Sequence, residues 1–194
     1  MVVKRVYVPE SMHDALVDAL ATRARAIKVG NGLDDGVEMG PINNRVQFAR
    51  VTGLVADALD HGAHAVTGGA PLDGPGYFYA PTILTGVAEG TRIVDEEQFG
   101  PALPIMPYQS VEEAIERANA STYGLGSSVW SNDQARAHAV AEQLESGTTW
   151  INTHAVLGHE QPFLGRKWSG LGASNGLYSI SAFSDMQTIY EARS

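Results

Sequence analysis

The sequence contains no cysteine. Disulfide bonds, thiolate metal sites and catalysis by a thiol of this chain are therefore excluded. Basic residues are few: the sequence has 13 lysines and arginines and 22 aspartates and glutamates, which gives a formal net charge of -9. This charge disfavours binding to nucleic acid and to anionic membranes. No apolar run reaches the ~18 residues of a membrane span, and the first residues lack the order of a signal peptide. We expect a cytoplasmic protein.

Strand-like and helix-like segments alternate along the chain. Short β-branched or apolar runs predict strands, and apolar residues spaced three or four apart predict helices. Strands are expected at residues 4–8, 65–67, 80–84, 102–108, 127–130 and 148–152, and helices over residues 11–30, 41–62, 111–118 and 132–144. Ser110 and Glu113 form a capping box for the third helix. This alternation indicates an α/β fold with a mostly parallel sheet and helices on both faces.

The last third of the chain is less regular. Residues 153–181 are expected to form a glycine-rich loop with scattered aromatic residues, and residues 182–190 a terminal strand. The loop carries His154, His159 and Glu160, which are residue types that bind zinc, although their spacing matches no standard zinc motif. Solvated or hydrogen-bonded histidines are the favoured interpretation. A metal-dependent hydrolase using these three residues is a distant alternative.

Several separated stretches match the motifs of one family. Glu97, Phe99, Gly100 and Pro101 match E-x-F-G-P, and residues 147–152 and 162–170 match G-x-x-W-I-N and P-F-G-G-x-K-x-S-G. Further matches lie at residues 4–9, 29–42 and 114–125. Together they resemble the catalytic domain of the aldehyde dehydrogenase superfamily over nearly the whole chain. Leu164 departs from the pattern, since it replaces the first glycine of P-F-G-G, and residues 173–176 replace the usual G-R-E-x-G.

The resemblance implies that residues 1–194 are an incomplete catalytic domain, without the dinucleotide-binding domain. In the family pattern the nucleophilic cysteine would fall just before Met1, and the glutamate and asparagine that assist it also lie upstream. No catalytic residue is then expected in this chain, and alone it should neither oxidise aldehydes nor bind a cofactor. A natural short chain acting as a non-catalytic binding or assembly partner is the alternative.

The resemblance also implies roles for particular side chains in an intact enzyme that uses NAD or NADP and a small aldehyde. Glu97 matches the carboxylate that holds the nicotinamide ribose, and Phe99 the aromatic residue beside the nicotinamide. Gln47 and Arg50 match contacts to the adenosine ribose, but a surface polar role is equally open. The expected residues at the mouth of the substrate tunnel are Asn152, Leu157 and Phe163. The surface around residues 97–103 that the missing domain would cover is expected to favour self-association, so a homo-oligomer is expected. No metal site is expected.

Overall fold

The computed structural model describes residues 3–192. The chain divides into two compact units, with the boundary between Ala114 and Ile115. Each unit is described by itself. Within residues 3–192, no helix has both the length and the apolar character that a membrane span requires.

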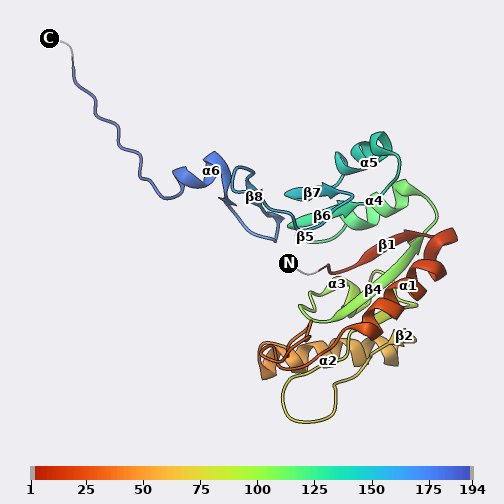
Figure 1. Ribbon diagram of the computed structural model, residues 1–194. Coiled ribbons are helices and arrows are strands. Elements are labelled where there is room, and N and C mark those ends of the chain that lie inside the picture. The colour runs from red at the N-terminus through yellow and green to blue at the C-terminus, as the bar shows by residue number, and fades with distance from the viewer. Residues whose placement is uncertain (1–2, 193–194) are drawn as a thin grey trace. The chain divides into compact units, whose positions relative to one another are not determined.

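A four-stranded sheet lies at the centre of the first unit, with the strand order β1-β4-β3-β2 (Figure 1). Strands β1, β4 and β3 are parallel, and β2 is antiparallel to β3. The register pairs Val6 with Ile105 and Ile83 with Leu103. The bounds are β1, Val6–Pro9; β2, His64–Thr67; β3, Thr82–Thr85; and β4, Ala102–Tyr108. The predicted sheet is therefore confirmed as mostly parallel, with one antiparallel edge strand.

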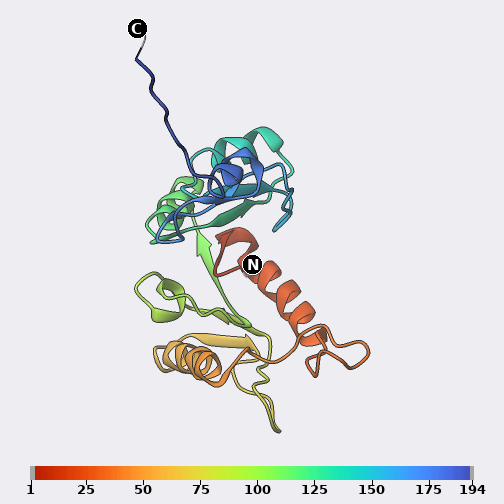
Figure 2. The same ribbon diagram turned by 90° about the vertical axis from the view of Figure 1, so that its left-hand side faces the viewer.

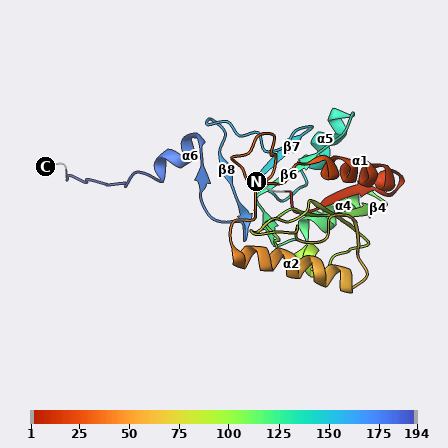
Figure 3. The same ribbon diagram turned by 60° about the horizontal axis from the view of Figure 1, so that its bottom comes forward.

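Helices cover both faces of this sheet. Helix α1 (His13–Ala26), which follows the 3-10 turn η1 (Glu10–Met12), packs on one face, and α2 (Arg45–Asp60) and α3 (Arg92–Asp95) pack on the other. Figures 2 and 3 show α1 in red and α2 in orange, separated by strands of the sheet. Neighbouring residues of one strand point to opposite faces, so Ile83 packs with the α1 cluster and Leu84 with the α2 cluster. The predicted α/β class, with helices on both faces, is confirmed.

Helix α2 begins later than the sequence pattern suggested. We expected a start at Pro41, but the first helical residue is Arg45. Asn44 has extended backbone angles, and its side chain accepts a hydrogen bond from the Gln47 amide at 2.9 Å. An asparagine in this position ends the preceding loop and supplies an acceptor for one otherwise unpaired amide of the first turn.

The second unit contains short paired strands and three helices. Strands β6 and β7 are parallel, whereas β5 pairs with β9 and β8 with β10 in antiparallel fashion. The capping box is present, because the Ser110 hydroxyl accepts a hydrogen bond from the Glu113 amide at 3.1 Å. The bounds are α4, Val111–Asn119, which crosses the unit boundary; β5, Tyr123–Gly124; β6, Gly126–Val129; α5, Gln134–Ala141; β7, Thr148–Ile151; β8, Phe163–Leu164; β9, Arg166–Lys167; β10, Ala173–Ser174; and α6, Gly176–Ser181.

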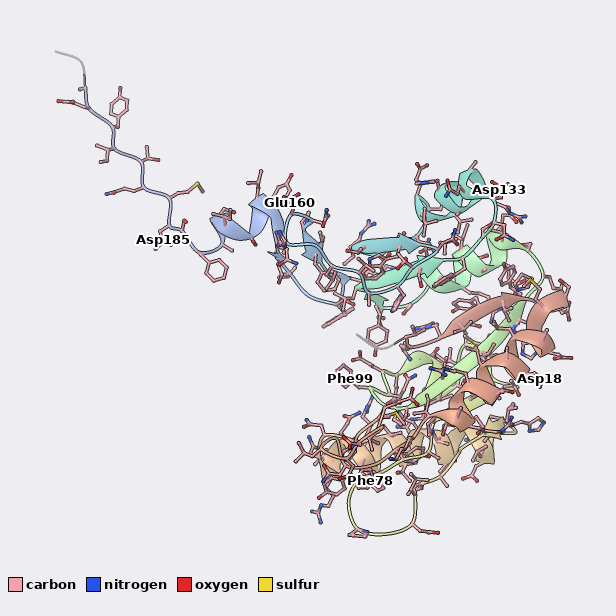
Figure 4. The ribbon with its side chains drawn as sticks, in the orientation of Figure 1. Asp18, Phe78, Phe99, Asp133, Glu160 and Asp185 are labelled. Carbon is pink, nitrogen blue, oxygen red and sulfur yellow. The ribbon has the colours of Figure 1, made fainter. Side chains whose placement is uncertain are left out.

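Two predictions for the end of the chain were wrong. Residues 153–181 are not a single loop, since they contain β8, β9, β10 and α6. Residues 182–190 do not form a strand, and Asp185 in Figure 4 marks this extended segment. A strand needs a neighbour for its backbone groups. The backbone hydrogen bonds of this segment instead return to α6, as from the Phe183 amide to the Ile180 carbonyl at 3.1 Å.

Candidate functional site

The first unit carries a turn at residues 96–99, between α3 and β4, whose backbone is held by side chains from elsewhere. Lys4, just before β1, donates to the Glu96 carbonyl. Arg50 of α2 donates from Nε to the Glu97 carbonyl at 2.9 Å. Gln47 of α2 donates from Nε2 to the carbonyls of residues 98 and 99, at 2.6 and 3.2 Å. Four consecutive carbonyl oxygens thus have side-chain donors, which fixes the path of the turn.

Gly100 allows this turn to lie directly against α2. A Cβ atom at position 100 would lie 2.5 Å from Cγ2 of Val51, which is far closer than van der Waals contact. Val51 is fully buried in the helix and forms part of the core cluster. Glycine therefore allows the backbone of the turn to lie directly against the Val51 side chain.

The 96–99 turn presents Glu97 and Phe99 at the surface. Both are exposed, Phe99 to 63%, and Figure 4 labels Phe99 at the end of the turn. Phe99 has φ of 44°, a left-handed conformation that costs a non-glycine residue about 1 kcal/mol or more. An exposed aromatic ring on a strained but well-held backbone is typical of a binding site rather than of core packing. A carboxylate can accept hydrogen bonds from a diol, and an aromatic ring can stack on a planar ligand.

Glu96 and Glu97 are adjacent but have different surroundings. The Glu96 carboxylate accepts a hydrogen bond from Arg92 Nε at 2.7 Å and lies 3.2 Å from Arg50. The hydrogen bond from Arg92, more than any other contact, holds the pKa of Glu96 below its usual value. Glu96 is therefore an ionised partner of two guanidinium groups.

Gln47 and Arg50 lie one turn apart on α2, as expected, and both face the 96–99 turn. Their side chains contact its backbone, a role that the sequence pattern did not suggest. Contact between these residues and an adenosine ribose stays a prediction. Sequence reasoning also missed Lys4, which contacts the same turn, and Gln98 within the turn, whose side chain bonds to the carbonyls of Lys4 and Ala102.

The expected tunnel residues all lie in the second unit. The Asn152 amide is held by the Ser131 backbone, with Oδ1 accepting at 2.9 Å and Nδ2 donating at 2.8 Å. Leu157 is 50% exposed, in the loop after β7. Phe163 is partly buried on β8, opposite Ser174. Their tunnel role stays a prediction.

His154, His159 and Glu160 are not brought together. His154 lies with Nδ1 3.2 Å from the Ser128 hydroxyl, and its ring packs edge-on against Trp150 with centroids 5.2 Å apart. Across residues 3–192, no group of three or more histidine, aspartate or glutamate side chains is placed to hold a metal ion. Nothing in this part of the chain therefore supports the alternative of a metal-dependent hydrolase.

Comparison with known proteins identifies relatives along almost the whole chain. Residues 1–189 match the aldehyde dehydrogenase family. The putative aldehyde dehydrogenase DhaS of Bacillus subtilis is 38% identical over 186 residues, which is 96% of this chain and 38% of that protein. The mitochondrial aldehyde dehydrogenase of Homo sapiens is 36% identical over 185 residues, which is 95% of this chain and 36% of that protein.

The backbone agrees as well as the sequence does. The structure of aldehyde dehydrogenase from Bacillus cereus in complex with NAD+ matches with a TM-score of 0.91 and 38% identity, covering 94% of this chain and 37% of that one. The chain spans about 38% of the length of the curated relatives it matches. Because the family model matches residues 1–189, and relatives agree with this chain in sequence and in backbone over more than nine-tenths of its length, the chain belongs to the aldehyde dehydrogenase family.

Proposed function

We propose that this chain supplies the nicotinamide side of the cofactor site in an NAD(P)-dependent aldehyde dehydrogenase. The 96–99 turn carries the proposal, because its held backbone presents an exposed carboxylate and an exposed ring two residues apart. In this proposal Glu97 accepts hydrogen bonds from the ribose hydroxyls, and Phe99 packs beside the nicotinamide. The similar aldehyde dehydrogenase from Bacillus cereus, whose structure is a complex with NAD+, supports the choice of cofactor.

In the intact enzyme, residues 1–194 would be an incomplete catalytic domain that acts together with a dinucleotide-binding domain. When bound, the cofactor supplies a hydride acceptor for oxidation of an aldehyde to an acid. The chain has no cysteine, so the attacking thiol that this chemistry requires cannot come from these 194 residues. We therefore propose that the chain by itself does not oxidise aldehydes.

The substrate in this proposal is a small aldehyde with an apolar group. Asn152, Leu157 and Phe163 are the side chains that we assign to the mouth of its tunnel. Leu157 and Phe163 offer apolar surface, and the held amide of Asn152 offers a fixed polar group. Replacement of Leu157 by glutamine should raise KM for hexanal more than KM for acetaldehyde, and equal effects on both would contradict the assignment.

We also propose that the protein is a homo-oligomer. Residues 177–190 expose several large apolar side chains, which in a stable protein usually indicates an interface. They are Leu177, Tyr178, Ile180, Phe183, Met186, Ile189 and Tyr190. Light scattering at micromolar concentration should give a dimer or larger species, and a monomer would contradict this part of the proposal.

The test of the cofactor site first identifies the protein that contains this chain, by immunoblot of source-cell extract with an antibody against the chain. That protein is then purified, and its affinity for NAD+ and NADP+ is measured by titration. Glu97→Gln should weaken binding about tenfold or more, because it replaces an ionised acceptor with a neutral amide. Glu112→Gln, a change of the same kind on the exposed side of α4, is the matched control and should leave the affinity unchanged. Equal affinities of the two variants would overturn the assignment of Glu97.

A further inference from the structure

Gln98 is the one side chain of the 96–99 turn that is fully buried. It is 1% exposed, whereas Glu97 and Phe99 on either side are exposed. Its Nε2 donates to the Lys4 carbonyl at 3.0 Å and to the Ala102 carbonyl at 2.7 Å. Both partners are carbonyls, so the amide nitrogen must be the atom that faces them. One amide group thus connects the residues that lead into β1 and β4.

Lys4 makes a second connection to this part of the chain. Its carbonyl accepts from Gln98, and its ammonium group donates to the carbonyls of Val94, at 2.6 Å, and Glu96. Lys4 therefore contacts the end of α3, the start of the 96–99 turn and the side chain at its centre. We call these two residues, which are joined by the hydrogen bond from Gln98 to the Lys4 carbonyl, the Lys4–Gln98 clamp.

The second polar atom of Gln98 shows that this arrangement has an energetic cost. Within residues 3–192, no group donates a hydrogen bond to its buried Oε1. An unpaired buried amide oxygen costs free energy that an apolar side chain of similar size would avoid. A glutamine at this position is therefore explained by what its nitrogen holds in place rather than by its contribution to core packing.

We propose that Lys4 and Gln98 are positioning residues that set the location of the Glu97 carboxylate for the cofactor ribose. The inference rests on the proposed cofactor role of Glu97. Gln47 and Arg50 hold the turn from the α2 side, and the clamp holds it from the β1 side. Loss of the clamp would leave the turn attached to α2 but would allow the carboxylate to move relative to the strands.

The test measures cofactor affinity in the purified protein that contains this chain. Lys4→Met and Gln98→Met keep the length of the side chain and remove the donor. Each should raise the Kd for NAD+ about threefold to tenfold. The matched control is Lys28→Met, since Lys28 also donates to a backbone carbonyl, that of Asp35 at 2.7 Å, away from the turn. It should leave Kd unchanged.

A double-mutant cycle separates positioning from general stability. In a Glu97→Gln background, Lys4→Met should change Kd by less than about twofold, because no carboxylate remains to be positioned. A Lys4→Met effect of the same size in both backgrounds, or no effect beyond that of Lys28→Met, would overturn the inference. If Glu97→Gln itself leaves Kd unchanged, the proposed function fails instead.

Hydrogen exchange on the chain provides a second measurement that needs no activity. The Glu96 amide bonds to the Arg92 carbonyl and the Ala102 amide to the Gly100 carbonyl, both at 2.8 Å, on either side of the turn. Both amides should exchange at least about fivefold faster in Lys4→Met and Gln98→Met, while the amides of α2 keep their rates. Uniform acceleration across the first unit would indicate only global destabilisation and would contradict the inference.

Discussion

Replacement of Gly100 by alanine tests whether the 96–99 turn depends on close approach to α2. The added Cβ would lie 2.5 Å from Cγ2, 3.4 Å from Cγ1 and 3.5 Å from Cβ of Val51. Val51 cannot swing aside easily, because a valine in a helix has one strongly preferred rotamer and this one is fully buried. The clash must then be relieved by movement of the turn or of α2.

The expected loss of stability follows from two opposing effects. Overpacking of a buried contact costs about 1–3 kcal/mol. Alanine lowers the conformational entropy of the unfolded chain relative to glycine. Where the native backbone conformation suits alanine, this effect raises the free energy of unfolding by about 0.4–1 kcal/mol. Gly100 is not among the glycines with positive φ, so this gain applies. The net effect is a loss of about 1–2 kcal/mol in the free energy of unfolding.

Urea unfolding followed by far-ultraviolet circular dichroism measures this change, since α1 and α2, of 14 and 16 residues, lie in the first unit. Val51→Ala removes both γ carbons, so the double variant should be more stable than the sum of the single effects by about 1–2 kcal/mol. Gly53→Ala is the matched control on the same helix, where no atom lies within 4 Å of the added Cβ. It should stabilise the chain by about 0.5–1 kcal/mol. A neutral Gly100→Ala, or strict additivity with Val51→Ala, would refute the reasoning.

Three further changes test other parts of the first unit. Burial lowers the pKa of Lys4 from 10.5 to about 8, so between these values the unfolded chain binds more protons than the native chain, and stability should rise with pH. Urea unfolding at pH 8 and at pH 10.5 should show a free energy of unfolding that is about 1–2 kcal/mol higher at pH 10.5, a figure already reduced for the partial exposure of Lys4. Lys4→Met should not show this rise. Asn44→Ala removes the cap of α2 and should cost about 1 kcal/mol in the same assay, whereas Asn44→Asp should cost little. Leu84→Ala, at a fully buried position of β3, should cost about 2–5 kcal/mol, and a loss below 1 kcal/mol would contradict the assigned core.

The fold class could be predicted because its signals are local. The helical spacing of Val51, Leu54 and Val55 corresponds to a buried face of α2, and the Ser110 capping box holds the start of α4. The prediction of a strand at residues 182–190 was wrong. A strand needs a second strand to pair with, and the sequence of the segment does not specify one.

The support of the candidate site could not be predicted for a related reason. The Gln47 side chain donates a hydrogen bond to the carbonyl of a residue 51 positions away, and the Lys4 side chain donates to a carbonyl 92 positions away. Such contacts depend on how β1, α2 and β4 pack, not on spacing along the chain. The motif containing Glu97 and Phe99 indicated where a site would be, but not which side chains hold it.

The hydrogen bonds to the carbonyls of residues 96–99 also have a consequence for evolution. Every amino acid carries the same carbonyl, so the hydrogen bonds that Gln47 and Arg50 donate to this segment do not depend on which side chains stand at positions 97 and 99. We therefore expect substitutions at positions 97 and 99 to keep these backbone hydrogen bonds, provided that the residue at position 99 tolerates the positive φ. Saturation libraries limited to these two positions would sample new ligand preferences on an intact scaffold.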